Sequence, residues 1–244
     1  MRRGLAFGFI LVATVALVAS FTPNRAEGPA TVYAAASLTD VFPKVSPSSR
    51  FQFAGSNQLA LQITRGAPAD VFASASPVYT QDLYRNGVVE KPRAFATNSL
   101  VLAIPRSNPA KIHSIQDLAK RPKLKLVVAG VKVPIGLYTR EVLKRLGLLR
   151  VLRKAVSQEP DVKGIVGKLA LGEADAGFVY ATDVRAASSR LIAIPLPKRS
   201  QPTVLYEVSV VKGSQNREGA LEFVADLLST DGRRELARAG FGLP

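Results

Sequence analysis

Short apolar runs with strand character alternate with helical patterns from residue 31 onward, and this alternation limits the fold more than any other feature of the chain. One helical stretch, for example, repeats apolar residues at Val162, Ile165, Val166 and Leu169, which lie on one helix face. Chains that alternate in this way fold as α/β proteins, with helices packed against sheets. The predicted strands are residues 31–36, 51–54, 70–74, 99–104, 125–129, 176–180, 191–194 and 205–211.

The first predicted strand runs into a helix start without a loop, in the segment TVYAAASLTD at residues 31–40. Its apolar run ends directly on Ser37, and Asp40 follows at the spacing of a capping box. A junction of this kind exposes backbone N–H groups and a hydroxyl at one point, which suits the binding of an anion. Ser37 is therefore a candidate anion ligand, although many serines at such positions only cap their own helix.

Three further junctions have a similar form, and each leaves free N–H groups at the N-terminus of a helix. Ser56 follows a strand end, Ile135 lies in a helix start that contains a proline, and Val162 follows the predicted cap Asp161. Tyr180 ends another predicted strand and, taken alone, is more typical of a half-buried tyrosine than of a ligand contact. Several such junctions in a chain without a catalytic set favour a receptor for a small anion.

The chain is predicted to form two lobes. Two strongly apolar segments, 99–104 and 205–211, are expected to pair as crossover strands between the lobes. Both ends of the chain then build one lobe, from residues 27–104 and 205–244, and residues 105–204 build the other.

Residues 1–26 have the features of an export signal. Two arginines precede an uncharged apolar run at 4–20, and small residues offer cleavage after Ser20 or Ala26. A membrane anchor is the alternative, because the run is close to spanning length. We prefer a cleaved signal, because a polar, proline-containing segment separates the run from the first strand.

Few residues in the chain could support catalysis. The sequence has no cysteine and one histidine, His113, and it lacks a nucleophile elbow, a phosphate-binding loop and a dinucleotide motif. The net charge of +15 is compatible with nucleic-acid binding. The basic residues are however scattered through helices and not interleaved with aromatic residues. We therefore predict a solvated basic surface and no nucleic-acid partner.

At these junctions the chain resembles periplasmic molybdate-binding proteins, the substrate-binding components of molybdate ABC transporters. The resemblance covers essentially the whole chain after the signal, and AAASL together with V-P-x-G-x-Y makes it specific. The matching segments are AAASLTD (34–40), FAGSNQLALQI (53–63), GAPADVFASAS (66–76), NSLVLAIP (98–105), VPIGLYTREVLKRLG (133–147), EPDVKGIVGKLALGEADAGFVYATD (159–183) and GFGLP (240–244).

The resemblance implies a type II periplasmic-binding-protein fold, in which two lobes, each a mixed sheet flanked by helices, close on one tetrahedral dianion. Matched by motif, Ser37 and Ser56 would supply hydroxyl and backbone N–H contacts from one lobe. Ile135 and Val162 would supply backbone N–H groups from the other lobe, and Tyr180 its phenol.

The same resemblance implies a monomeric periplasmic receptor that has no enzymatic activity and no cofactor. Its ligand would be molybdate or tungstate, so that molybdenum is present only as the bound oxyanion. Its partner would be an ABC permease in the membrane.

The chain departs from the usual pattern of this family at three places. Ile135 stands where alanine is common, so its N–H contact would survive while the larger side chain reshapes the cavity wall. Gly55 and Asn57 flank Ser56 where small hydroxyl residues are usual. The segment between Ser37 and Ser56 is short and contains two prolines, which predicts a truncated first helix.

Other functions remain open from the sequence. A receptor for another tetrahedral oxyanion, such as sulfate, would use the same junctions and differ mainly in cavity radius. Ferric iron is disfavoured, because Tyr180 has no adjacent tyrosine. The alternative from a different class is a secreted serine hydrolase that uses Ser37 or Ser56 and would have to recruit His113.

Overall fold

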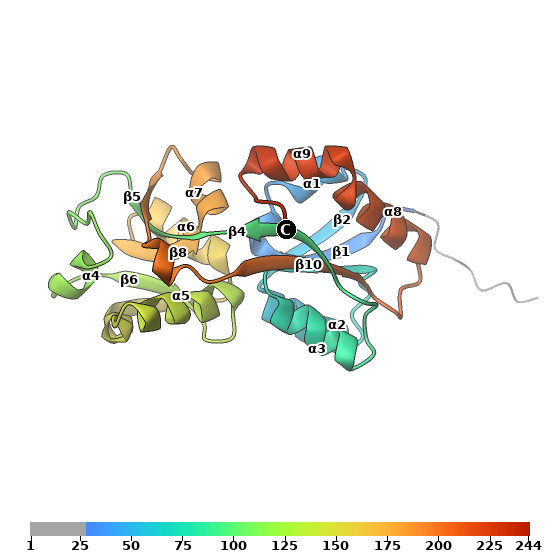
Figure 1. The fold of residues 1–244 in the computed structure, drawn as a ribbon, viewed down its shortest axis with the longest axis horizontal. Helices are drawn as coiled ribbons and strands as arrows, with labels where there is room; N and C mark the ends of the chain where they lie inside the picture. The colour runs from blue at the N-terminus through green and yellow to red at the C-terminus, as the bar shows by residue number, and fades with distance from the viewer. Residues whose placement is uncertain (1–27) are drawn as a thin grey trace, which may run out of the picture.

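The structure is a computed structural model that describes residues 28–244, and these form two lobes that lie side by side (Figure 1). Each lobe is built on a five-stranded mixed sheet with helices against it, so the predicted two-lobed α/β fold is confirmed. The predicted signal peptide, residues 1–26, lies outside the described residues. Within residues 28–244, no helix combines the length and the apolar character that a membrane span requires.

The first lobe holds a mixed sheet in which three neighbouring parallel strands are followed by an antiparallel strand and an edge strand. In spatial order the strands are β2 (Arg50–Ala54), β1 (Thr31–Ala35), β3 (Val71–Ser74), β10 (Val204–Val210) and β4 (Arg93–Asn98). β1 runs parallel to β2 and β3, whereas β10 runs antiparallel to β3 and β4. Strands from both ends of the chain therefore share one sheet.

Helices cover both faces of this first sheet (Figure 1). On one face lie α2 (Ser56–Thr64) and α3 (Pro77–Arg85), and on the other lie α1 (Phe42–Val45), α8 (Arg217–Leu228) and α9 (Thr230–Ala239). Phe42 of α1 and Phe223 of α8 are buried and pack edge to face, with ring centroids 5.4 Å apart. This aromatic contact joins the start of the chain to its end.

The second lobe holds the middle of the chain. In spatial order its strands are β7 (Ala155–Glu159), β6 (Leu126–Ala129), β8 (Ala176–Tyr180), β5 (Leu100–Pro105) and β9 (Leu191–Pro195). Its helical elements are α4 (Asp117–Lys120), α5 (Pro134–Arg145), η2 (Leu149–Lys154), α6 (Val162–Ala170), α7 (Ala181–Ala186) and η3 (Lys198–Ser200). All five residues of the central strand β8 are buried, as expected for a strand covered on both faces.

The predicted pairing of 99–104 with 205–211 is wrong. β5 pairs with β8 and β9 in the second sheet, while β10 pairs with β3 and β4 in the first. The chain therefore passes from the first sheet to the second at Ser99, so β5 lies in the second lobe, whereas residues 27–104 were predicted to lie in the first. It returns between β9 and β10, close to the boundary predicted at 204.

Two strands, β4 and β7, were not predicted. Each lies at an edge of its sheet, where one side of the strand has no neighbouring strand. Their sequences, RAFATN and AVSQE, mix polar and apolar residues, and each strand includes exposed residues. Because edge strands need no continuous apolar run, the apolar pattern from which strands are predicted is weak in both β4 and β7.

Candidate functional site

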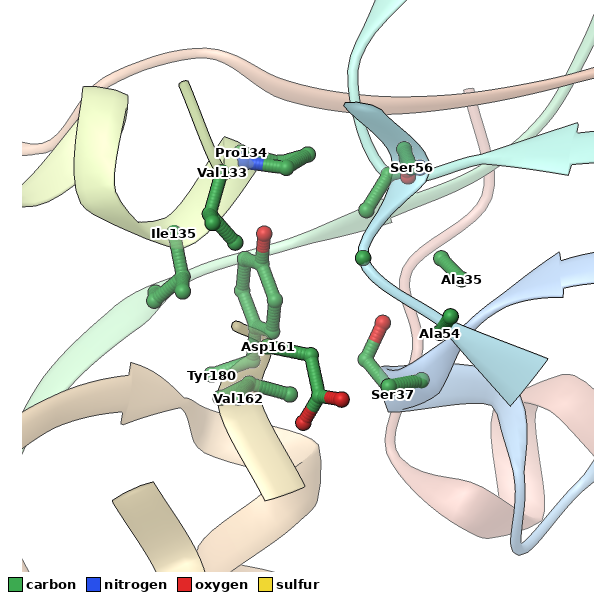
Figure 2. A pocket seen from close by; sticks show the side chains of 13 residues that line it. Ala35, Ser37, Ala54, Ser56, Val133, Pro134, Ile135, Asp161, Val162 and Tyr180 are labelled. Atoms are coloured by element: carbon green, nitrogen blue, oxygen red, sulfur yellow. Dashed lines mark hydrogen bonds between the residues drawn. The ribbon is translucent and has the colours of Figure 1, made fainter. Parts of the chain in front are cut away.

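A small cavity lies between the lobes, where strand ends and helix N-termini of both lobes meet. The first lobe contributes residues 35–37, 54–56 and Ala75, and the second contributes residues 133–135 and 161–162 with Tyr180. Figure 2 shows the two walls facing each other across the cavity. All five residues predicted from the sequence line this cavity: Ser37, Ser56, Ile135, Val162 and Tyr180.

Ser37 reaches the cavity from η1 (Ala36–Leu38), a single 3-10 turn that follows β1 directly. Its Oγ lies 3.0 Å from the Oη of Tyr206 on β10, and the residue is buried. The capping box expected from its spacing to Asp40 is not formed, because the N-cap position is Ala35 and no side chain caps the turn. The strand continues straight into a turn too short to need a cap. The truncated first helix is confirmed.

Ser56 is the first residue of α2, and Gly55 is the N-cap. The Oγ of Ser56 accepts a hydrogen bond from the backbone N–H of Ala75 at 3.1 Å. Since that bond uses a lone pair, the hydroxyl proton of Ser56 remains for another acceptor.

Gly55 has a steric role that no local sequence pattern indicates. A Cβ at this position would lie 2.5 Å from the carbonyl oxygen of Pro160, in the loop before α6. Glycine at position 55, where the family usually has a small hydroxyl residue, thus lets the N-terminus of α2 approach the opposite lobe.

The N-terminus of α5 presents backbone donors to the cavity. Pro134 occupies the first helical position and has no N–H, and the N–H of Leu137 already bonds to the Val133 carbonyl at 2.9 Å. The N–H groups of Ile135 and Gly136 lie between them, in the turn where helix donors have no intrahelical partner. Gly136 is required here, because a Cβ would collide with the carbonyl oxygen of Gly130.

The N-terminus of α6 is arranged in the same way. Asp161 is its N-cap, as predicted, and the Asp161 Oδ1 accepts from the N–H of Gly164 at 3.1 Å. The N–H groups of Val162 and Lys163 belong to the first turn and have no intrahelical acceptor. Two helix N-termini therefore point their partial positive charges at one wall of the cavity.

Tyr180 ends β8 and is 1 % exposed. Its hydroxyl has no hydrogen-bond partner among the described residues, although the oxygen is fully enclosed. Burial raises the pKa of the Tyr180 phenol well above its ordinary value, so the phenol stays protonated near neutral pH. A buried, protonated and unsatisfied hydroxyl is a donor that lacks an acceptor.

The cavity lining contains no lysine, arginine or histidine among its thirteen residues. Asp161 is the one charged residue there, and its carboxylate is engaged by the first turn of α6. Within residues 28–244, no group of three or more His, Cys, Asp or Glu side chains is placed to hold a metal ion. The only histidine, His113, is exposed in the loop before α4 and does not line the cavity.

An ion-pair network joins the lobes beside the cavity. Lys163 of α6 lies 2.6 Å from the Oδ2 of Asp40 in the first lobe and 3.3 Å from the Oδ1 of Asp183 in the second. The other oxygen of Asp183 accepts from the backbone N–H of Tyr180 at 3.2 Å. Burial raises the pKa of Asp183 to about 6, against the opposing effect of the Lys163 charge.

Direct contacts also hold the lobes together around the cavity. The Tyr138 hydroxyl on α5 donates to the carbonyl oxygen of Ala75 at 3.2 Å, and the Tyr79 hydroxyl on α3 donates to the carbonyl oxygen of Lys132. The walls of the cavity therefore meet in a closed arrangement.

Residues 30–242 match the family model described as bacterial extracellular solute-binding protein. The molybdate-binding protein ModA of Mycobacterium tuberculosis strain H37Rv is 34% identical to this chain, over 99% of this chain and 98% of that protein.

Solved structures share the fold. The periplasmic molybdate-binding protein of Azotobacter vinelandii matches with a TM-score of 0.77 at 22% identity, over 88% of this chain and 99% of that chain. The sulfate-binding protein SubI of Mycobacterium tuberculosis H37Rv matches with a TM-score of 0.74 at 15% identity, over 88% and 86%. At these identities the likeness concerns the fold alone, and it confirms the periplasmic-binding-protein architecture expected from the sequence.

Proposed function

Because this chain belongs to the family of bacterial extracellular solute-binding proteins, we propose that it binds molybdate in the interlobe cavity and delivers it to an ABC permease. The ligand contacts in this proposal are the hydroxyl and backbone N–H groups of Ser37 and Ser56, the backbone N–H groups of Ile135 and Val162, and the Tyr180 phenol. A relative that is collinear with nearly the whole chain bears the name molybdate-binding protein, which supports this choice of ligand.

The observation that carries the proposal is that neutral donors converge on the cavity from both lobes without a cationic side chain in its lining. Molybdate is fully deprotonated near neutral pH, so it offers only acceptors. A hydrogen bond to a charged group contributes about 1.5–3 kcal/mol. Several such bonds, together with two helix N-termini, can offset the cost of desolvating a dianion.

The unsatisfied hydroxyl of Tyr180 supports the same ligand chemistry. Leaving a buried donor unpaired costs about 1–3 kcal/mol. An oxyanion in the cavity would remove this cost, since each of its oxygens accepts hydrogen bonds. The phenol would therefore contribute to binding without any change in its own protonation.

Related anions follow from the same chemistry. Tungstate has the charge and tetrahedral shape of molybdate, so we expect it to bind at the same residues. Sulfate has the same charge but is smaller, and donors spaced for the larger ion would reach its oxygens less well.

The remaining features of the proposal concern where and how the protein acts. We propose a periplasmic monomer that is exported with its signal peptide and released by cleavage. Catalysis is not part of the proposal, because the serines in the cavity have no histidine beside them. This arrangement gives no support to a serine hydrolase.

The proposal is tested by thermal unfolding of the purified protein with molybdate, tungstate, sulfate and phosphate at equal concentrations. A ligand present at about one hundred times its dissociation constant should stabilise the protein by ~2.7 kcal/mol. We expect this shift from molybdate and tungstate, and a smaller one from sulfate and phosphate. If none of the four anions raises the melting temperature, the proposal is wrong. A sulfate shift equal to that of molybdate would show that the ligand is assigned too narrowly.

A further inference from the structure

Tyr206 lies behind the cavity wall and has no role in the binding site described above. It is fully buried on β10, and its Oη lies 3.0 Å from the Oγ of Ser37. Both groups are hydroxyls, so the distance between them does not say which one donates. The direction of this bond matters, because it decides whether the Ser37 proton faces Tyr206 or the cavity.

Asn98, at the end of β4, determines the direction. Its Oδ1 accepts from the backbone N–H of Ser99 at 2.9 Å, which sets the orientation of the side-chain amide. The Asn98 Nδ2 then faces the Oγ1 of Thr182 at 2.9 Å and the Oη of Tyr206 at 3.5 Å. Since an amide nitrogen only donates, Tyr206 accepts from Asn98 and keeps its own proton to donate.

Burial raises the pKa of Tyr206, so its phenol carries a proton throughout the neutral range. Among the described residues, the Oγ of Ser37 is the acceptor within hydrogen-bond distance of the Tyr206 hydroxyl, since the Asn98 Nδ2 can only donate. With one lone pair of Ser37 occupied by Tyr206, the proton of the Ser37 hydroxyl is left for the cavity.

We infer that Tyr206 is a positioning residue, which with Asn98 forms a directed hydrogen-bond chain that fixes Ser37 as a donor toward the bound anion. The inference rests on the proposed function, since it concerns the same oxyanion site. It adds a basis for specificity: Tyr206 occupies one lone pair of Ser37 and the Ser37 proton points to the anion, so an oxyanion that carries a proton would bring a second donor against the Ser37 donor.

The inference makes a distinct prediction for hydrogen phosphate. Sulfate and hydrogen phosphate are both tetrahedral dianions of similar size at mildly alkaline pH, and they differ by one proton. In the native protein, the Ser37 hydroxyl proton points to the anion and so disfavours binding of an anion that carries a proton at that oxygen. When Ser37 is free to rotate, it can turn a lone pair toward the cavity and accept it.

The experiment measures dissociation constants for molybdate, sulfate and hydrogen phosphate by calorimetry, with competition against molybdate for weak ligands. Tyr206→Phe removes the hydroxyl and keeps the ring. Asn98→Asp replaces the donor with an acceptor, so that Tyr206 would donate to Asp and Ser37 to Tyr206. We expect hydrogen phosphate to gain about tenfold relative to both molybdate and sulfate in each variant. Tyr84→Phe, on the exposed face of α3, is the matched control and should change no ratio.

Ratios of affinities are used because the new charge in Asn98→Asp weakens all dianions alike. If the three anions lose affinity by one common factor, Tyr206 is merely structural and the inference is overturned. Unchanged ratios in both variants overturn it as well. Native protein that binds no oxyanion would refute the proposed function itself, which is a different outcome. Thermal unfolding without ligand checks that each variant folds. If Tyr206→Phe does not fold, the affinity ratios of Asn98→Asp decide the test.

Discussion

The two walls of the interlobe cavity supply hydrogen-bond donors by different means. On the first-lobe wall the side-chain donors are the hydroxyls of Ser37 and Ser56, and each is already held by a hydrogen bond within its own lobe. On the second-lobe wall the donors are N–H groups at the starts of α5 and α6, together with a phenol that has no partner among the described residues. The first wall therefore depends on side-chain identity as well as on the backbone at the start of α2, whereas the second depends mainly on backbone position.

This difference separates the effects of substitutions. On the first wall, removal of a hydroxyl removes a donor. On the second wall, a side chain can change while its N–H stays in place, provided that the helix start keeps its position. Close approaches at glycine residues hold that position, so glycine substitutions should damage the second wall most.

The largest effect is expected from Gly136→Ala in the first turn of α5. The added Cβ would collide with the carbonyl oxygen of Gly130, so the helix start must move away from the cavity. We expect the free energy of unfolding to fall by about 1–3 kcal/mol, as for other overpacked sites. Molybdate affinity measured by calorimetry should fall more than for any single hydroxyl removal.

Gly167→Ala in α6 is the control for this change, because a Cβ there meets no atom within 4 Å. It should raise the stability by roughly 0.5–1 kcal/mol through helix propensity and leave affinity unchanged. Equal behaviour of the two variants would contradict a steric role for Gly136.

Ser37→Ala should produce the next largest effect, and it acts on the first wall. Loss of one hydrogen bond to a charged ligand should weaken molybdate binding by about 1.5–3 kcal/mol, or roughly tenfold to a hundredfold. Ser209→Ala on β10 is the matched control, because that buried hydroxyl has no partner among the described residues and does not line the cavity. A Ser37→Ala protein that loses stability but keeps its affinity would return Ser37 to a structural role.

Local sequence patterns were sufficient to find four of the thirteen residues that line the cavity. These residues are Ser37, Ser56, Ile135 and Val162. Each follows a strand end or a helix start whose sequence pattern is local, so it can be recognised without knowledge of the fold. The cap at Asp161 was predicted for the same reason, and its bond to Gly164 is present.

Long-range features were not predictable in the same way. The bond between Tyr206 and Ser37 joins residues 169 positions apart, and no spacing rule connects them. The requirement for Gly55 depends on a loop of the other lobe, so a sequence comparison shows only that a hydroxyl is missing there. The wrong partner for β5 has a similar origin, because an apolar run indicates burial but does not say in which sheet.

A pH-dependent effect is expected at Asp183 of the second lobe, which bonds to the Tyr180 N–H and pairs with Lys163. Burial raises the pKa of Asp183 from 3.8 to about 6. Between these values the folded protein binds a proton that the unfolded chain has released, so stability from this group falls as pH rises. Asparagine at this position does not ionise.

The difference in unfolding free energy between Asp183→Asn and the native protein should therefore increase with pH through this window. We expect a change of about 1–3 kcal/mol, followed by a plateau above the folded pKa. Denaturant unfolding at several pH values measures it. A difference that decreases with pH would mean that the Lys163 charge outweighs burial.

The smallest effect on binding is expected from Ile135→Val on the second wall. Ile135 is 1 % exposed, so removal of a buried methyl group should lower the free energy of unfolding by about 0.5–1.5 kcal/mol. Its backbone N–H remains at the start of α5, and molybdate affinity should change by less than about twofold, because no donor is lost. Calorimetry alongside Ser37→Ala compares the two walls directly. An affinity loss at Ile135 as large as that at Ser37 would show that the second wall also depends on its side chains, because valine keeps the N–H and changes only the shape of the cavity.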